Sequence, residues 1–335
     1  MSAVHVVVPE GIDDPARPSG GNTFDRRVID GLRETGSTVQ VHEVASGRAL
    51  AAVVAAIPDG SVVLLDGLVA SPAPDLLVPE AERLQLVVLV HMPLCDDHEA
   101  AVLTAAQSVI TTSGWARRML LERYALRAER VRVAEPGVDA AEPAPGTRNA
   151  GALLTVGAVI PGKGHDILVE ALADLGDVRW ECECVGSVER EPAFAADVRR
   201  RMRERGLDGR VRFPGPKVGA ELARSYEMAD LLVLPTRGET YGMVVTEALA
   251  RGLPVVAADV GGVREALGYG AEGDRPGVLV PPDDPVALRE ALQAWLSDAR
   301  LRGRFRRAAG ERRGTLTSWS TTTSVVGSVL AEAAR

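Results

Sequence analysis

The sequence has very little lysine. Two of its 38 Lys and Arg residues are lysine, Lys163 and Lys217, and all the others are arginine. The formal net charge is −8, which argues against nucleic acid as a partner because proteins that bind it carry a basic surface. In such an arginine-rich chain the two lysines mark places where a compact ammonium suits the chemistry better than a planar guanidinium.

Cysteine is also scarce, and long hydrophobic runs are missing. The three cysteines, Cys95, Cys182 and Cys184, are odd in number and have the spacing of neither a disulfide framework nor a zinc site. No apolar run approaches the roughly 20 residues that a membrane span needs. The first nine residues place no basic stretch ahead of an apolar one. We therefore expect reduced thiols and a cytoplasmic protein.

Short Val- and Leu-rich runs alternate with helical patterns along the whole chain, which indicates an α/β fold with parallel sheets. With 335 residues the chain is long enough for two domains, and the Pro-, Gly- and Ala-rich residues 142–151 are the predicted linker. The expected strands are 4–8, 39–44, 62–65, 86–90, 109–112 and 131–134, then 153–156, 179–185, 211–213, 231–234, 255–258 and 277–280.

Residues 235–254 hold the most informative motif. A buried strand ends at Pro235, a helix is expected from about Tyr241 to Arg251, and Gly252 can end it. Glu239 then lies in the crevice beyond the strand, where open α/β sheets bind ligands. The amides of the first helical residues can donate to a diphosphate, and Glu247 can reach a diol on the same ligand. The amides in question belong to Tyr241, Gly242 and Met243.

This stretch resembles the Glu-x7-Glu motif of the family 4 retaining glycosyltransferases, which have the two-domain GT-B fold. The resemblance implies two Rossmann-like domains whose parallel sheets face each other across a cleft. Residues 1–145 would form the acceptor domain, residues 151–316 the nucleotide-sugar donor domain, and residues 317–335 a helix crossing back to the first. In the family the first Glu, here Glu239, lies by the donor sugar, and the second, Glu247, binds the ribose. The alternative is an ordinary strand-loop-helix unit with two solvated glutamates.

Lys163 follows the expected strand 153–156 in a stretch similar to the family's Gly-Arg-loop-Lys-Gly motif, whose cations neutralise the donor diphosphate. A fixed cation favours the transition state because the leaving diphosphate gains charge as the glycosidic bond breaks. The sequence departs from the family in having Ala158 at the Arg position. Arg237 and Arg264 are candidates to replace that cation, or the amides do more of the work. Lys217 lies in a stretch that resembles the part of the family against the nucleobase.

Two further positions match the family in the first domain. Gly20 and Gly21 end a long loop before a helix, where a backbone without side chains can approach a ligand closely, and in the family this loop faces the pyrophosphate. The alternative is a flexible turn. His91, at the end of strand 86–90, resembles the family histidine that contacts the transferred sugar; the alternative is a structural histidine.

Two other features could indicate a metal site and a membrane contact, but we expect neither. His98 with Asp96 and Asp97 could mimic a metal cluster, but we expect no metal because GT-B enzymes generally bind the diphosphate without one. Residues 115–124 could form a basic helix at a membrane surface, but a surface helix with a core face fits this acidic chain better.

The predicted function is that of a retaining, metal-independent hexosyltransferase. It would move a sugar from a UDP- or GDP-sugar to a hydroxyl of a small molecule or glycan, with no cofactor beyond this co-substrate. The predicted catalytic residues are His91, Lys163 and Glu239. Two alternatives stay open: a GT-B sugar-nucleotide epimerase, and a catalytically silent sugar-nucleotide-binding protein, for which Ala158 is the main argument. The sequence does not indicate the donor base, the acceptor or the oligomeric state.

Overall fold

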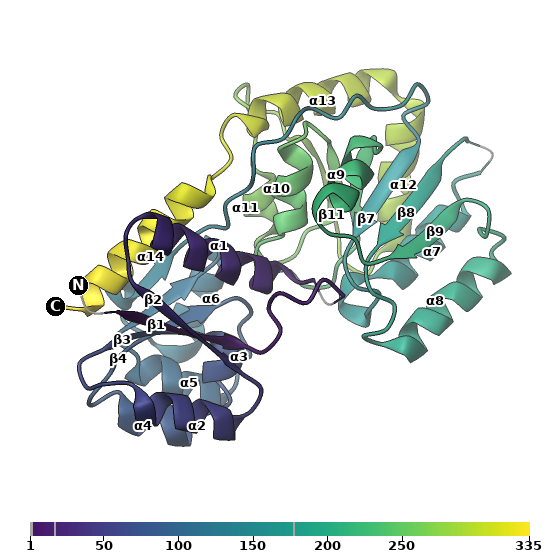
Figure 1. The fold of residues 1–335 in the computed structure, drawn as a ribbon. Helices are drawn as coiled ribbons and strands as arrows, with labels where there is room; N and C mark the ends of the chain where they lie inside the picture. Colours follow the sequence, from purple (N-terminus) through teal and green to yellow (C-terminus); the bar gives the residue numbers. More distant parts are fainter. Residues whose placement is uncertain (1–2, 17, 177) are drawn as a thin grey trace. The chain divides into compact units, whose positions relative to one another are not determined.

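The structure is a computed structural model that describes residues 3–16, 18–176 and 178–335. The chain forms two compact units (Figure 1). Unit 1 takes the chain up to Asp14, then Pro18–Gly137 and Thr317–Arg335; unit 2 takes Val138–Leu316 with a short stretch at Pro15. In both units helices cover the two faces of a parallel sheet, which confirms the predicted fold class of two Rossmann-like units.

The described strands of unit 1 form one sheet of order β2-β1-β3-β4-β5-β6, with parallel pairing throughout. Each strand lies within one or two residues of its predicted range. Their bounds are β1 Val4–Pro9, β2 Val39–Val44, β3 Val62–Asp66, β4 Gln85–Val90, β5 Ser108–Thr111 and β6 Val131–Val133. The runs are apolar almost throughout because a parallel sheet is buried on both faces.

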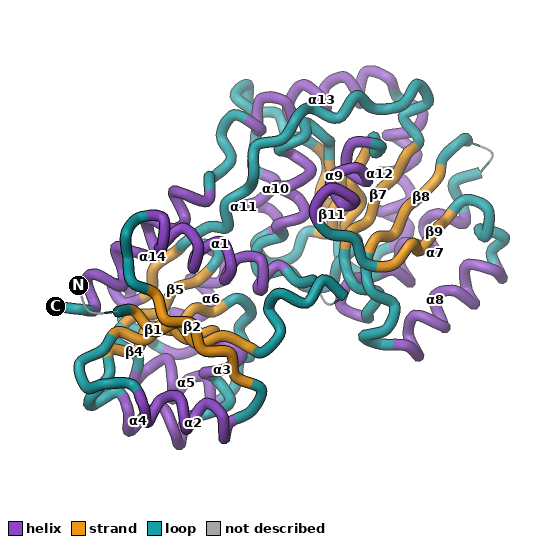
Figure 2. Tube along the Cα trace, in the orientation of Figure 1, coloured by secondary structure: helices purple, strands orange, loops and turns teal. Residues whose placement is uncertain are grey.

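Alternate strand residues of unit 1 point to two separate apolar layers. One layer holds α2, α4, α5 and α6, and the other holds α1 and α14. Figure 2 shows α2, α4 and α5 on one side of the sheet and α1 and α14 on the other. The helices are α1 Gly20–Glu34, α2 Gly47–Ala56, α3 Gly67–Ala70, α4 Pro74–Glu80, α5 Asp97–Ala105, α6 Gly114–Tyr124 and α14 Trp319–Ala333, with a 3-10 turn η1 at Ala128–Arg130.

The chain's last helix, α14, packs closely on α1. A Cβ atom at Gly31 of α1 would lie 2.3 Å from Oγ1 of Thr323, so only glycine permits this approach. At the other end of the contact the ring of Trp319 packs edge-on against Phe24, with 5.9 Å between centroids. Phe24 is fully buried and belongs to the same core cluster as the apolar residues of α14.

Unit 2 has a second parallel sheet, of order β12-β11-β10-β7-β8-β9 among the described residues. The six predicted strands are again present. Their bounds are β7 Ala152–Val156, β8 Glu181–Val185, β9 Val211–Gly215, β10 Leu231–Leu234, β11 Val255–Ala258 and β12 Gly277–Val280. The helices are α7 His165–Ala173, α8 Pro192–Glu204, α9 Gly219–Glu227, α10 Met243–Leu249, α11 Val263–Leu267, α12 Pro285–Ser297 and α13 Ala299–Arg313, with a 3-10 turn η2 at Pro161–Lys163.

Helix α10 is shorter than the predicted helix over 241–251. It begins at Met243 because Gly242, its N-cap, has a φ of 101°, a left-handed conformation that a helix cannot include. Its last helical residue is Leu249. Tyr241 and Gly242 therefore belong to the loop that precedes the helix.

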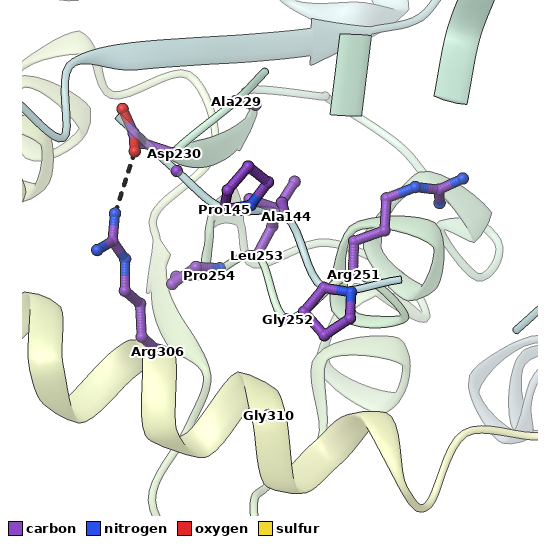
Figure 3. A pocket seen from close by; sticks show the side chains of 12 residues that line it. Ala144, Pro145, Ala229, Asp230, Arg251, Gly252, Leu253, Pro254, Arg306 and Gly310 are labelled. Atoms are coloured by element: carbon purple, nitrogen blue, oxygen red, sulfur yellow. Dashed lines mark hydrogen bonds and ion pairs between the residues drawn. The ribbon is translucent and has the colours of Figure 1, made fainter. Parts of the chain in front are cut away.

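Residues 142–151, the predicted linker, lie in unit 2. Within them, residues 143–146 line a hollow of about 200 Å³ together with Arg251, Pro254 and Arg306 (Figure 3). Asp230 is completely buried at this end of the sheet and accepts hydrogen bonds from Thr147, Ala152 and Arg306. The hollow lies where β10 and β11 begin, at the edge opposite to the one where Rossmann-like sheets bind ligands. We interpret it as a structural feature.

None of the helices in the described ranges combines the length and the apolar character that crossing a bilayer requires.

Candidate functional site

The topological switch point of unit 2 lies between β7 and β10, because the chain continues to one side after β7 and to the other side after β10. The loops that follow these two strands pack directly on each other. The amide of Arg237 donates to the carbonyl of Gly162 over 2.8 Å. Gly164 has a φ of 67°, and a Cβ there would lie 1.9 Å from the carbonyl oxygen of Pro235. Glycine is required at this turn for both reasons.

These loops bring Lys163 and Glu239 into direct contact. The Lys163 ammonium, at the end of η2, forms an ion pair with Oε1 of Glu239 in the loop after β10. Both side chains keep some exposure, 28% for Lys163 and 14% for Glu239. A cation and a carboxylate therefore meet at the sheet edge where ligands bind in this class of fold. Two residues 76 positions apart in the sequence form one polar centre.

Arg237 and Arg264, the two candidates to replace the cation missing at Ala158, are both ion-paired in the structure. Arg237 binds Asp166 with both terminal nitrogens, at 2.9 and 2.8 Å, and Asp283 through Nε at 2.6 Å. Burial raises the pKa of Asp166, but the bonds from Arg237 outweigh it and lower the pKa overall. Arg264 is paired with Asp259. Both arginines are thus neutralised by carboxylates of their own unit, and Arg237 fastens the loop that carries Lys163.

Glu247 is half-buried in α10 and accepts a 2.6 Å hydrogen bond from the hydroxyl of Tyr226. Burial raises the pKa of Glu247, although the Tyr226 bond and the nearby Arg251 oppose the rise. The guanidinium of Arg251 lies over the Tyr226 ring, 4.8 Å from its centroid. One face of the Glu247 carboxylate is therefore held in place from within unit 2. Tyr241 and Gly242 are buried in the loop before the helix, and Met243 is its first residue.

Lys217, the second lysine, also has partners. Its Nζ lies 2.8 Å from Oε1 of Glu183 on β8 and 2.8 Å from Oγ of Ser225 on α9. Burial raises the pKa of Glu183, but the hydrogen bonds from Lys217 and Ser225 lower it overall. Lys217 lies just beyond β9, two strands away from the Lys163–Glu239 pair in the sheet order.

In unit 1 the Gly-Gly pair lies in the helix and not in the loop before it. Gly20 and Gly21 form the first turn of α1, and Ser19 caps it by accepting a hydrogen bond from the amide of Asn22 over 3.1 Å. A Cβ at Gly21 would lie 3.4 Å from the His91 ring, at ordinary van der Waals distance. The first turn of α1 therefore lies directly against the histidine that follows β4.

His91 forms a compact cluster with two aspartates, which we call the His91 cluster: Asp25, Asp66 and His91. Nε2 of His91 lies 2.7 Å from Oδ1 of Asp25 on α1 and 3.7 Å from Oδ2 of Asp66 at the end of β3. The side chains are 10% exposed for His91 and 3% for each aspartate. Phe24 packs edge-on against the imidazole, with 5.2 Å between centroids.

The loop after β4 is held by a buried carboxylate. Glu99 on α5 accepts hydrogen bonds from the amides of Leu94 and Cys95 and from the hydroxyl of Tyr124 at 2.7 Å. Burial and the Glu99 contact raise the pKa of Tyr124. The loop that begins with His91 is fixed at its far end as well.

His98, Asp96 and Asp97, which the sequence analysis discounted as a metal cluster, do not come together as one. Asp96 caps α5 by accepting from the amide of Glu99, and His98 is exposed. In the described ranges, the His91 cluster alone brings three candidate metal-ligating side chains within 4.8 Å of one another.

Sequence reasoning missed Asp25, Asp66 and Glu99. A signal for Asp25 was present, because positions 25, 29 and 32 share the buried face of α1, and an acid on an apolar face needs an explanation. Asp66 ends the apolar run of β3, beside the end of β4. Only the strand order shows that β3 and β4 are neighbours.

The fold agrees with the comparisons to known proteins. Residues 150–298 match the family described as "Glycosyl transferases group 1". It is 35% identical over 243 residues to the D-inositol 3-phosphate glycosyltransferase of Kineococcus radiotolerans, a match that covers 64% of this chain and 55% of that protein. The chain spans about half the length of the curated relatives it matches.

Two solved structures share the fold over nearly the full chain. A glycosyltransferase from Rickettsia africae has a TM-score of 0.80 at 19% identity, covering 99% of this chain and 98% of that one. The Anabaena protein HepE, solved in complex with UDP and glucose, has a TM-score of 0.77 at 18% identity, covering 98% and 99%. At these identities the likeness establishes the GT-B fold alone.

Proposed function

We propose that this protein is a retaining glycosyltransferase that moves a hexosyl unit from a nucleoside diphosphate sugar to a hydroxyl of a small molecule or glycan. The contact between Lys163 and Glu239 at the switch point of unit 2 is the observation that carries the proposal. The family match of residues 150–298 and the similarity to relatives named as D-inositol 3-phosphate glycosyltransferases support it. UDP is the first choice of nucleotide, because HepE was solved with UDP.

In the proposed mechanism the bond from the anomeric carbon to the diphosphate oxygen breaks, and the acceptor oxygen attacks that carbon from the same face. The acceptor's proton passes to the leaving phosphate, so the configuration is retained without a protein nucleophile. Lys163 stabilises the charge that develops on the diphosphate, and Glu239 orients the sugar. A ligand that engages Lys163 would loosen its ion pair with Glu239 and free the carboxylate for sugar hydroxyls.

The other donor contacts are proposed from the family pattern. Glu247 would bind the ribose diol with the carboxylate face that Tyr226 leaves open. The amides of Tyr241, Gly242 and Met243 would face the diphosphate, and Lys217 would lie by the nucleobase. In unit 1, Gly20 and Gly21 would face the pyrophosphate and His91 would contact the sugar. No metal is needed in this scheme.

Calorimetric titration of the full chain with UDP, GDP, ADP and dTDP tests the donor site. We expect UDP to bind most tightly, and Glu247→Ala to weaken binding about 10- to 100-fold because hydrogen bonds to a charged group are lost. Tyr226→Phe is the matched control, since it removes the internal partner of Glu247 and leaves the carboxylate. Absence of binding by all four nucleotides would refute the donor site.

Turnover separates the proposal from its alternatives. A transferase releases UDP from a UDP-sugar only as an acceptor is glycosylated, and D-inositol 3-phosphate is the first acceptor to try because the relatives are named for it. Proton NMR of the product would show whether the anomeric configuration is retained. An epimerase would change the sugar without releasing UDP, and a silent binding protein would leave donor and acceptor unchanged.

A further inference from the structure

The His91 cluster joins three elements of unit 1 at the carboxyl edge of its sheet. Asp66 is the last residue of β3 and pairs in register with Leu89 of the neighbouring β4, two residues before His91. Asp25 reaches the same place from the buried face of α1. The switch point of this sheet lies between β1 and β3, so the cluster occupies the position where a ligand is expected.

The cluster contains more buried acid than its own hydrogen bonds satisfy. Asp25 and Asp66 are both buried, and Oδ2 of Asp25 is buried without a hydrogen-bond partner. One oxygen of Asp66 caps α3 by accepting a hydrogen bond from the amide of Leu68 at 2.5 Å. Two carboxylates removed from water in this way require a proton or a cation close by. The charge they act on is the imidazole of His91.

The geometry favours a proton over a metal ion. The 2.7 Å between Nε2 of His91 and Oδ1 of Asp25 is a hydrogen-bond distance. Ligand atoms around a tetrahedral zinc ion are about 3.3 Å apart, since each lies about 2 Å from the metal. Both aspartates lie on the Nε2 side of the ring. No hydrogen bond joins Nδ1 to any residue that the structure describes, and Nδ1 is not among the buried atoms that lack a partner.

We propose that Asp25 and Asp66 are positioning residues that hold His91 with a proton on both ring nitrogens, so that Nδ1 donates a hydrogen bond to an oxygen of the sugar ligand. This inference rests on the proposed function for the identity of the ligand. Nε2–H donates to Asp25, and Asp66 adds a second negative charge on the same side. A neutral ring with its proton on Nε2 would instead offer Nδ1 as an acceptor. The cluster therefore decides which kind of ligand atom His91 can bind.

The electrostatics of the cluster agree with this assignment. Burial lowers the pKa of His91, but the charge and hydrogen bond of Asp25 and the charge of Asp66 raise it overall. Burial raises the pKa of Asp66 to about 7, with Asp25 adding to the rise and His91 opposing it. In the described part of the chain these two aspartates, from α1 and from the β3–α3 junction, are the charged groups that act on His91. Phe24 and Gly21, which also contact the ring, carry no charge.

The test is the titration of His91 in the full chain, followed through its ring nitrogens in a histidine-labelled sample by NMR. The signals are assigned by their loss in His91→Gln. We expect both nitrogens to stay protonated above pH 7. In Asp25→Asn the midpoint should fall by a pH unit or more, a tenfold loss in proton affinity, and in Asp66→Asn by less. Asn retains the shape of each side chain and can still cap α3 at position 66.

Asp30→Asn, on the exposed face of the same helix, is the matched control and should leave the midpoint unchanged. A wild-type midpoint at or below 6.5, or an unchanged midpoint in both cluster variants, would overturn the proposal. Because Asp25→Asn and Asp66→Asn each change a different carboxylate beside the ring, the test survives if one of them fails to fold.

The role toward the ligand has its own readout. In UDP release from a UDP-sugar, Asp25→Asn should lower kcat about tenfold and leave KM for the donor nearly unchanged. The pH at which activity is lost should move to lower values together with the His91 midpoint. If no sugar is transferred at all, the proposed function fails while the NMR result still decides the protonation of His91. A normal kcat with a lowered His91 midpoint would refute the positioning role alone.

Discussion

Each unit places a histidine at the carboxyl edge of its sheet, and the two units treat it in opposite ways. His91 of unit 1 lies between two aspartates, which raise its pKa. His165 of unit 2, the first residue of α7, is completely buried, and neither ring nitrogen has a hydrogen-bond partner. Burial lowers its pKa to about 4, with the adjacent Lys163 adding to the effect. Its closest aromatic contact is Phe213, at 6.2 Å between centroids.

The surroundings therefore favour a positive charge on the histidine of unit 1 and a neutral ring on the histidine of unit 2. In unit 2 the positive charge at the switch point belongs to Lys163, and a charged His165 beside it would be a like-charge neighbour. In unit 1 the cluster has no lysine or arginine, and His91 is the group that we propose to carry the positive charge. Position in the sheet suggests that a residue is functional, but the charges around it decide what it can do.

The largest effect that would separate the two units comes from removing the cation of unit 2. Lys163→Ala should lower kcat about 100- to 1,000-fold, as the loss of one preorganised group that stabilises transition-state charge does in other enzymes. Lys217→Ala should cost tenfold or less, because Lys217 lies two strands away and is held by Glu183. UDP release from a UDP-sugar measures both, with Arg212→Ala on the exposed surface as control. Equal losses in the two lysine variants would contradict the assignment of Lys163 to the diphosphate.

The second effect is on stability in acid. The folded pKa of His165, about 4, lies below the unfolded value of 6.5, so its contribution is fully present above pH 6.5 and is lost as the pH falls toward 4. The loss amounts to about 3 kcal/mol over this range. His165→Leu should remove it, so that the variant gains stability over wild type as the pH falls from 7 to 4.5. Urea denaturation at several pH values measures the difference, and the exposed His98→Gln should show no such trend.

Most of the fold can be predicted from the sequence, because each buried parallel strand appears in it as a short apolar run. The helix after β10 was predicted too long, since the φ of 101° at Gly242 is set by the surrounding loops and not by local propensity. The partners of Arg237 also could not be predicted from the sequence. Asp166 and Asp283 are 71 and 46 residues away in the sequence, and only the sheet order brings them to it.

The site divides in the same way. Lys163, Glu239 and His91 stand in loops at strand ends, where motif spacing identifies them. Asp25 lies inside a helix and Asp66 ends a strand, so each one alone looks like an ordinary polar residue in an amphipathic pattern. The role proposed for Asp25 and Asp66 depends on their contact with His91 in the folded chain, and sequence spacing does not predict that contact.

The third prediction reverses the pH trend in unit 1. The folded pKa of Asp66, about 7, lies above its unfolded value, so the contribution of Asp66 to stability is full below about pH 4 and is lost as the pH rises through 7. Asp66→Asn should therefore gain at least about 1 kcal/mol over wild type on going from pH 4 to pH 8. Urea denaturation measures this, with Asp30→Asn as control. Wild type and variant that stay parallel across this range would mean that burial does not raise the pKa of Asp66.

The smallest effect concerns the first turn of α1, which contacts His91. A methyl group at position 21 would meet the ring at 3.4 Å, an ordinary contact, and alanine is the better helix former. Gly21→Ala should therefore raise the stability of unit 1 by about 0.5 kcal/mol and leave the NMR midpoint of His91 unchanged. Thermal unfolding measures the change in stability, NMR measures the His91 midpoint, and calorimetry measures the affinity for UDP. If the donor diphosphate approaches the backbone of this turn as proposed, the methyl group should weaken UDP binding even though the protein is more stable. An unchanged affinity would assign Gly21 to the packing of His91 and leave nucleotide binding to unit 2.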